Sequence, residues 1–318
     1  MSWWLIFCAQ ALAGGFYHPS DVAGSSAVYR NAAEGTGAAI QQLQDRAGSL
    51  SIGLRDYEEA LDLLGDRADP SERERLKTLT IQYNRQFATA QAFAEVMAED
   101  FDTEFTAAMD RALDAVGGGT LCVGMVPDGR GVPGMRQPMK PNPDCKGEDR
   151  NAQIADKMDK DKALATAVAE ILALEWPQIQ LDTAEPGTAA GTGDRYVQTS
   201  LFFEAVIPKT LKRIRLDDDT ERLDIQAAIE DNASKEQLVA YREQARAISE
   251  ATSAKRAAVA SPILDAADTS AAKWQKKGQA PFAWCASPQS LGGCTGTDAS
   301  TELVTQISAD KRVTKLLP

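Results

Sequence analysis

The sequence contains a single histidine, His18, and lacks the short motifs around which most familiar active sites are built. A Ser-His-Asp triad would have to take its base from the N-terminal segment that carries His18. The paired Glu-x-x-His motifs of di-iron bundles, the His-Glu-x-x-His of zinc proteases, the P-loop and a Gly-x-Gly-x-x-Gly after a strand are all absent. The sequence therefore predicts no catalytic, cofactor-binding or metal-binding residue, and we expect no cofactor.

Positive charge is also scarce. The chain has 34 Lys and Arg residues against 46 Asp and Glu residues, which gives a net charge of −12. Because such a surface repels phosphate backbones, we expect no nucleic-acid partner. The basic group Lys209, Lys212, Arg213 and Arg215 is followed at once by Asp217–Asp219, which indicates a solvated helix end with local charge compensation and acids placed before a further helix.

Long apolar runs are missing, since no stretch approaches the roughly 20 residues that a membrane-spanning helix needs. The most apolar segment is the N-terminus, where Met1–Ala13 has no charged side chain and ends in Ala11-Leu12-Ala13. This segment resembles a bacterial signal peptide cleaved after Ala13, although it is short and carries no Lys or Arg. A buried apolar N-terminal segment is the alternative. We expect a periplasmic or extracellular location after removal of the leader.

Cysteines are few, and their positions agree with export. Four remain once Cys8 of the leader is set aside, and each neighbouring pair brackets a short loop rich in small turn residues. We predict the disulfides Cys122–Cys145 and Cys285–Cys294, each fixing a loop that has little core of its own. A zinc site is the weaker alternative because no Cys-x-x-Cys occurs, and buried free thiols would apply if the leader is wrongly identified.

Glycine and proline are absent from residues 71–116, which predicts one very long helix. Asp69 stands at the N-cap, Pro70 at the first helical position and Glu72 completes a capping box, while Gly117–Gly119 ends the run. The preceding segment repeats apolar residues at 3-4 spacing, as in a coiled-coil seam: Ile40, Leu43, Ala47, Leu50, Leu54, Tyr57, Leu61 and Leu64. Because the connection is short, we predict an antiparallel coiled-coil hairpin.

The rest of the chain also indicates helices, so the predicted fold class is all-α, an elongated bundle built on that hairpin. We expect helices over about 149–175, over 209–261 with a break near Asn232, over 262–277 and over 299–316. Residues 196–207 fit either a strand or a helix. The predicted division is a leader at 1–13, a first helical region at 14–176, a linker at 177–195 and a second helical region at 196–318.

These features favour an exported, non-enzymatic structural or interaction protein of the cell envelope or exterior, which associates with itself or with another envelope protein. One alternative is a membrane-active protein that inserts the 196–207 segment, with Leu201, Phe202, Phe203 and Ile207 as candidate contacts, although membrane contact is the less favoured reading. The other alternative is a carboxylate-dependent glycan-processing enzyme, because acidic residues are plentiful even though no pair stands out.

Overall fold

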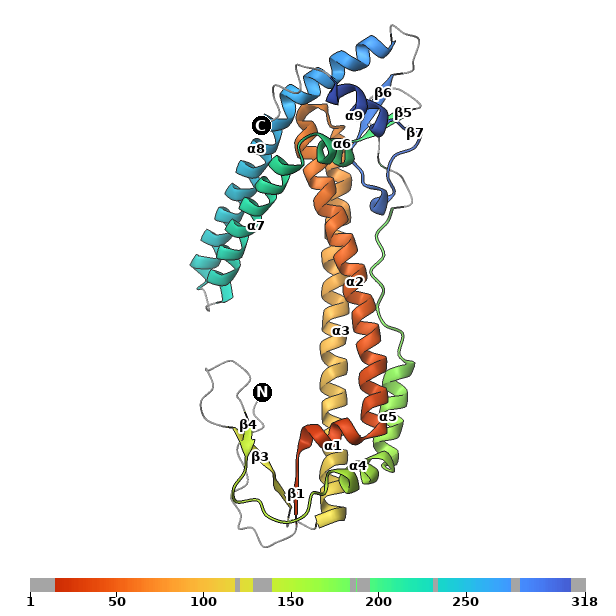
Figure 1. Cartoon of the computed structure of the whole chain (residues 1–318), viewed down its shortest axis with the longest axis vertical. Helices are drawn as coiled ribbons and strands as arrows, with labels where there is room; N and C mark the ends of the chain where they lie inside the picture. The colour runs from red at the N-terminus through yellow and green to blue at the C-terminus, as the bar shows by residue number, and fades with distance from the viewer. Residues whose placement is uncertain are drawn as a thin grey trace. The chain divides into compact units, whose positions relative to one another are not determined.

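The computed structural model describes residues 15–117, 121–127, 139–183, 187, 195–230, 234–275 and 281–309. This part of the chain is mostly helical, with short strands (Figure 1), and it contains two disulfides. The helices are α1 (Pro19–Ser25), α2 (Ala27–Leu64), α3 (Pro70–Gly117), α4 (Asn151–Asp159), α5 (Lys162–Ala173), α6 (Thr199–Val206), α7 (Pro208–Glu230), α8 (Lys235–Gln275) and α9 (Ser300–Ser308). The short strands correct the all-α prediction to a mostly helical one. The predicted leader lies outside the described residues.

The contacts divide the chain into two compact units. Unit 1 draws on residues up to Asp45 and on Ala88–Gln178, and unit 2 on Arg46–Phe87 and the residues from Ile179 onward. Both long helices, α2 and α3, contribute one portion to each unit. The sequence-based division had placed the whole of both helices in the first region.

Unit 1 is built around its first strand. Strand β1 (Gly15–Tyr17) pairs in parallel with β2 (Leu121–Val123). On its other side, the Phe16 amide donates to the Glu148 carbonyl at 2.9 Å, and the Arg150 amide donates to the Phe16 carbonyl at 3.0 Å. Strands β3 (Met125–Pro127) and β4 (Met139–Pro141) form an antiparallel pair after β2. The start of the described chain is therefore hydrogen-bonded along both edges.

The predicted helix over 149–175 is two helices, α4 and α5, because Asp161 starts a new helix as the N-cap of α5. Asp159 accepts hydrogen bonds from the Ser26 hydroxyl at 2.6 Å and from the Ala27 and Val28 amides, and so closes the N-terminus of α2. Asp161 caps α5 and pairs with Arg111 at 2.7 Å. Burial opposes ionisation of Asp159, but its hydrogen bonds outweigh burial and lower its pKa.

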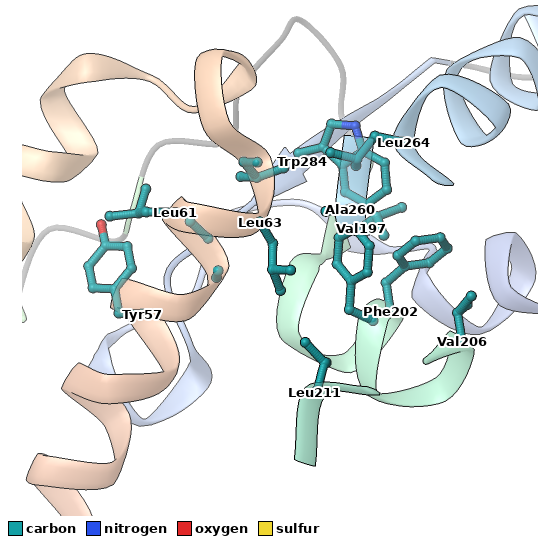
Figure 2. Packing of buried hydrophobic residues seen from close by; sticks show 14 of the residues in the cluster. Tyr57, Leu61, Leu63, Val197, Phe202, Val206, Leu211, Ala260, Leu264 and Trp284 are labelled. Atoms are coloured by element: carbon teal, nitrogen blue, oxygen red, sulfur yellow. The ribbon is translucent and has the colours of Figure 1, made fainter. Parts of the chain in front are cut away.

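The core of unit 2 joins α2 and α3 to the C-terminal elements. Tyr57, Leu61 and Leu63 of α2 belong to the same buried cluster as Phe202 of α6 and Trp284 of β6 (Figure 2). A parallel sheet borders this core, with β5 (Arg195–Gln198) between β6 (Phe282–Cys285) and β7 (Thr297–Asp298). Six residues of the predicted apolar repeat are buried here: Ala47, Leu50, Leu54, Tyr57, Leu61 and Leu64.

Two glycines inside α2 allow other segments of the chain to pack closely against this helix. A Cβ on Gly53 would lie 2.6 Å from the Ser290 hydroxyl, and one on Gly35 would lie 2.3 Å from the side chain of Leu172. These positions allow the loop after β6 to approach α2 in unit 2, and α5 to approach it in unit 1.

Several helix boundaries test the local predictions. Asp69 accepts from the Ser71 amide at 2.9 Å at the start of α3, and Ser234 and Gln237 exchange hydrogen bonds at the start of α8, so both predicted caps are confirmed. The prediction of a separate helix from 262 is wrong, since α8 continues through Pro262. Asp217–Asp219 lie inside α7 rather than before a helix. Residues 196–207 contain both a strand end and α6.

Helices α7 and α8 lie side by side (Figure 1). Among the described helices, none combines the length and the apolar character required to cross a membrane.

Candidate functional site

Both predicted disulfides are confirmed: Cys122 is bonded to Cys145, and Cys285 to Cys294. The first links strand β2 to the loop that follows β4, within unit 1. The second links the end of β6 to a residue that bridges with Gly187 in unit 2. Each bridge therefore fixes a loop beside a helical core, as the cysteine spacing predicted.

The predicted contact residues fall on two sides of α6. Leu201 is 55% exposed, whereas Phe202, Phe203 and Ile207 are buried. The rings of Phe202 and Phe203 touch edge to face, and Phe202 makes a similar contact with Trp284 (Figure 2). In the folded chain three of the four residues therefore belong to the core, and Leu201 alone is available to a membrane or partner.

A buried polar network fastens the second cross-linked loop to α2 and α3. Tyr57 donates a hydrogen bond to Glu72, and both side chains are buried. Arg75 donates to the Ser287 hydroxyl and to the Leu291 carbonyl, both at 2.8 Å. Burial, followed by the Glu72 carboxylate, raises the pKa of Tyr57. This arrangement satisfies buried groups and gives the loop a fixed position, which is a structural role.

Ion pairs hold α7 and α8 against α2. Arg215 of α7 contacts Glu59 of α2 at 2.8 Å. Arg256 of α8 contacts Asp62 of α2 at 3.0 Å, and Ser253 donates to the same carboxylate at 3.0 Å. Since Glu59, Asp62 and Arg256 are buried, the relative positions of the three helices depend on these pairs.

Unit 2 contains a groove of about 530 Å³ between α2 and α3, called here the α2–α3 groove. Its floor is apolar, formed by Leu54, Leu61 and Leu76. Its remaining lining is polar or exposed: Ser51, Arg55, Glu58, Asp62, Arg73, Lys77, Thr80, Ile81, Tyr83 and Asn84. A second hollow of about 430 Å³ shares Glu58, Asp62 and Arg73 and is also lined by residues of α8.

The charges of the α2–α3 groove are unequally satisfied. Arg55 pairs with Asp219 at 3.3 Å, and Asp62 is engaged by Arg256. Glu58 is on the surface, yet desolvation by neighbouring protein and the charge of Asp62 raise its pKa. The groove thus presents basic groups from both walls and one carboxyl whose ionisation is disfavoured.

Among the described residues, no group of three or more His, Cys, Asp or Glu side chains is placed so that it could hold a metal ion. His18 lies beside Phe16, and a Cβ on Gly124 would meet its ring at 2.5 Å. Its backbone amide donates to Asn151 at 2.7 Å, so His18 helps to join β1 to α4.

Comparison of the chain with protein-family models, curated proteins and solved structures gives no match. The candidate site therefore depends on the geometry of this chain alone. The sequence analysis predicted Leu54 and Leu61 as apolar positions of a helix seam, but no local pattern indicated that they would line a groove.

Proposed function

We propose that this chain is an exported, non-enzymatic structural or interaction protein of the bacterial cell envelope or exterior, and that it self-assembles. The observation that carries the proposal lies on α7, where Leu216 and Leu223 are 56% and 64% exposed at a spacing of seven residues. A single exposed leucine is ordinary, but leucines one heptad apart on a charged helix are typical of a surface that meets another helix.

The ion pairs and disulfides that hold the helices in place support the same function. Unit 2 fixes α2, α7 and α8 with buried ion pairs, and both units contain a disulfide. A surface held in this way loses little conformational freedom when it binds, which favours specific association. The disulfides are also consistent with an oxidising compartment, the periplasm or the exterior.

We also propose that α2 and α3 pair along their lengths as an antiparallel coiled-coil hairpin. Contacts inside each unit support this pairing: Tyr57 with Glu72 in unit 2, and Tyr29 with Phe101 and Phe105 in unit 1. Small-angle scattering from the non-reduced protein tests it, because a continuous hairpin requires a longest dimension near the roughly 70 Å of α3 or above. A markedly shorter particle would contradict the pairing.

The test of the proposed function is the mass of the exported, non-reduced protein, measured by light scattering and by intact mass spectrometry. We expect loss of residues 1–13, loss of four hydrogens for two disulfides, and an assembly larger than one chain. A monomer at every concentration would contradict self-assembly. Retention of the leader with free thiols would contradict export.

A glycan-processing enzyme is the second candidate, and Glu58 is the residue that favours it. A carboxyl with a raised pKa beside a second acid in a groove resembles a general acid. Glu58 and Asp62 lie one turn apart on the same helix, however, and the α3 wall contributes Arg73 and Lys77 rather than a facing acid. Hydrolysis of envelope glycans by the native chain, abolished in Glu58→Gln, would favour the enzyme over the structural protein.

A further inference from the structure

The lining of the α2–α3 groove is spaced so that a third helix could bind along it. Its α2 wall follows Ser51, Leu54, Arg55, Glu58 and Leu61, and its α3 wall follows Arg73, Leu76, Lys77, Thr80 and Ile81. Both runs keep the three- and four-residue steps by which one helix packs along another. Leu54 and Leu61 of the floor are seven residues apart, the same spacing as Leu216 and Leu223 of α7.

The complementary feature is a narrow face of α7, called here the α7 stripe, which consists of Leu216, Asp219, Thr220 and Leu223. These positions follow the i, i+3, i+4, i+7 pattern of one helix face. Both leucines are exposed in the isolated chain, so the chain's own groove does not cover them. The leucines of α7 and, in the groove, the exposed Ile81 and partly exposed Leu76 are therefore open to a partner. Leu54 and Leu61 beneath them are already buried in the chain's own core.

Charge distinguishes this pairing from a merely apolar one. The groove contributes Arg55, Arg73 and Lys77 from its two walls, beside the acids Glu58 and Asp62. Arg73 and Lys77 are exposed, and their ion pairs within the chain are long, at 3.9 Å and 3.7 Å, so both can also meet acids of a partner. The segment that carries the stripe is rich in acids, with Asp217 and Glu221 exposed beside it. Opposite charges along an otherwise apolar seam are what fixes partner and register when helices associate.

The stripe and the groove also touch each other within one chain. Asp219 of the stripe lies 3.3 Å from Arg55 of the groove wall, so the two form one continuous surface. A surface that contains both a ridge and its matching groove can pair with a copy of itself around a two-fold axis, each copy supplying both parts. Such a contact closes at two chains instead of growing into a filament.

We propose that a second copy of this chain occupies the α2–α3 groove with its α7 stripe, forming a two-fold symmetric dimer. This inference rests on the proposed self-assembly and names the surface that produces it. The leucines of one copy rest on Leu76 and Ile81 of the other, while the acids of α7 face Arg73 and Lys77. The two equivalent contacts bury both apolar surfaces and double the area that each copy contributes.

The test is sedimentation equilibrium of the mature, non-reduced protein over a wide concentration range. We expect a mass that reaches a plateau at two chains. Leu223→Asp in the stripe and Ile81→Asp in the groove should each raise the dimer dissociation constant by roughly tenfold or more. Val96→Asp is the matched control, because Val96 is 51% exposed on α3 but lies outside the groove and the stripe. It should leave the dimer unchanged.

All three substitutions are at exposed positions, so circular dichroism should show native helicity for each. Assembly that is insensitive to both Leu223→Asp and Ile81→Asp would overturn the inference while leaving the proposed self-assembly intact. A mass that grows without a plateau would overturn the two-fold closure. A monomer at all concentrations would overturn both the inference and the proposed self-assembly.

Discussion

Removing one partner of the Arg256–Asp62 pair should be among the most destabilising single changes in unit 2. In Arg256→Met the Asp62 carboxylate keeps the Ser253 hydroxyl at 3.0 Å and Arg73 at 3.9 Å, but loses its buried cation. Breaking a buried ion pair from one side costs about 3–5 kcal/mol, because the remaining charge is uncompensated. Since Asp62 borders two hollows that admit water, we expect about 3 kcal/mol.

The assay is denaturant unfolding of the non-reduced protein, followed by circular dichroism. The double variant Asp62→Leu with Arg256→Met should cost much less than the sum of the two single variants, because it leaves no buried charge behind. Arg246→Met is the control on the same helix. Its pair with Glu250 is exposed, and its loss should cost about 0.5 kcal/mol or less. If Arg256→Met loses less than about 1 kcal/mol, or if the losses of the two single variants add up in the double variant, Arg256 and Asp62 do not form a stabilising buried ion pair.

Four further outcomes can be measured in the same unfolding assay. Asp159→Ala should lower the free energy of unfolding by about 1–2 kcal/mol, because it removes the cap on α2. Since the folded pKa of Asp159 is lowered, the stabilisation by its carboxylate is present above the ordinary Asp pKa of about 3.9 and is lost as the pH falls through the lowered pKa. Phe202→Ala should lose about 3–5 kcal/mol through a cavity beside Trp284, whereas Leu201→Ala should lose little. Replacing Cys285 and Cys294 together by serine should cost about 2–3 kcal/mol, the loop-entropy value for a separation of nine residues. Glu58→Gln should stabilise the chain at neutral pH, because the raised pKa of Glu58 means that its ionisation opposes folding. This stabilisation should vanish below the ordinary Glu pKa of about 4.3, where the carboxyl is protonated in both states. Stabilisation that persists there would contradict this reasoning.

Features that depend on neighbouring residues could be predicted from the sequence. The caps at Asp69 and Ser234 act on amides two or three residues away, so the chain displays both partners together. Both disulfides close short loops, and for that reason the spacing of the cysteines indicated their pairing. The apolar repeat on α2 likewise predicted which of its faces is buried.

Features that depend on distant residues could not be predicted in the same way. Asp159 caps α2 through Ser26, which is 133 positions away, and Arg256 meets Asp62 across 194 positions. Helix α8 passes through Pro262 because Ala260, Ile263 and Leu264 around it are buried in the core, and this tertiary packing outweighs the lost backbone hydrogen bond. Strands of three residues have no periodicity long enough to recognise.

The candidate groove shows the same division between local and distant information. The predicted helix over 209–261 contains both Leu216 and Leu223, but the exposure of these two side chains depends on how α7 packs in the folded chain and could not be predicted. From the sequence, the basic and acidic side chains around residue 215 were expected to neutralise one another's charge. The structure instead pairs Arg215 with Glu59 of α2 and Asp219 with Arg55, so these charges join helices rather than neutralise their neighbours.

A chain with a net charge of −12 repels its own copies at long range, and a self-association site must overcome this repulsion. The dimer proposed here places Arg73 and Lys77 at contact distance from the acids of α7, while the remaining negative charge acts over longer distances. At physiological salt the screening length is about 8 Å, so long-range repulsion is weakened far more than pairing at contact. Dimerisation should therefore strengthen when the salt concentration rises from very low to physiological values. In Lys77→Glu, which adds repulsion inside the groove, the dimer should remain weaker than in the native chain at physiological salt. A native dimer that weakens steadily over the same range would show that attraction at contact outweighs the general repulsion at every salt concentration. A Lys77→Glu dimer as strong as the native one at physiological salt would contradict the assignment of the acidic α7 surface to this groove.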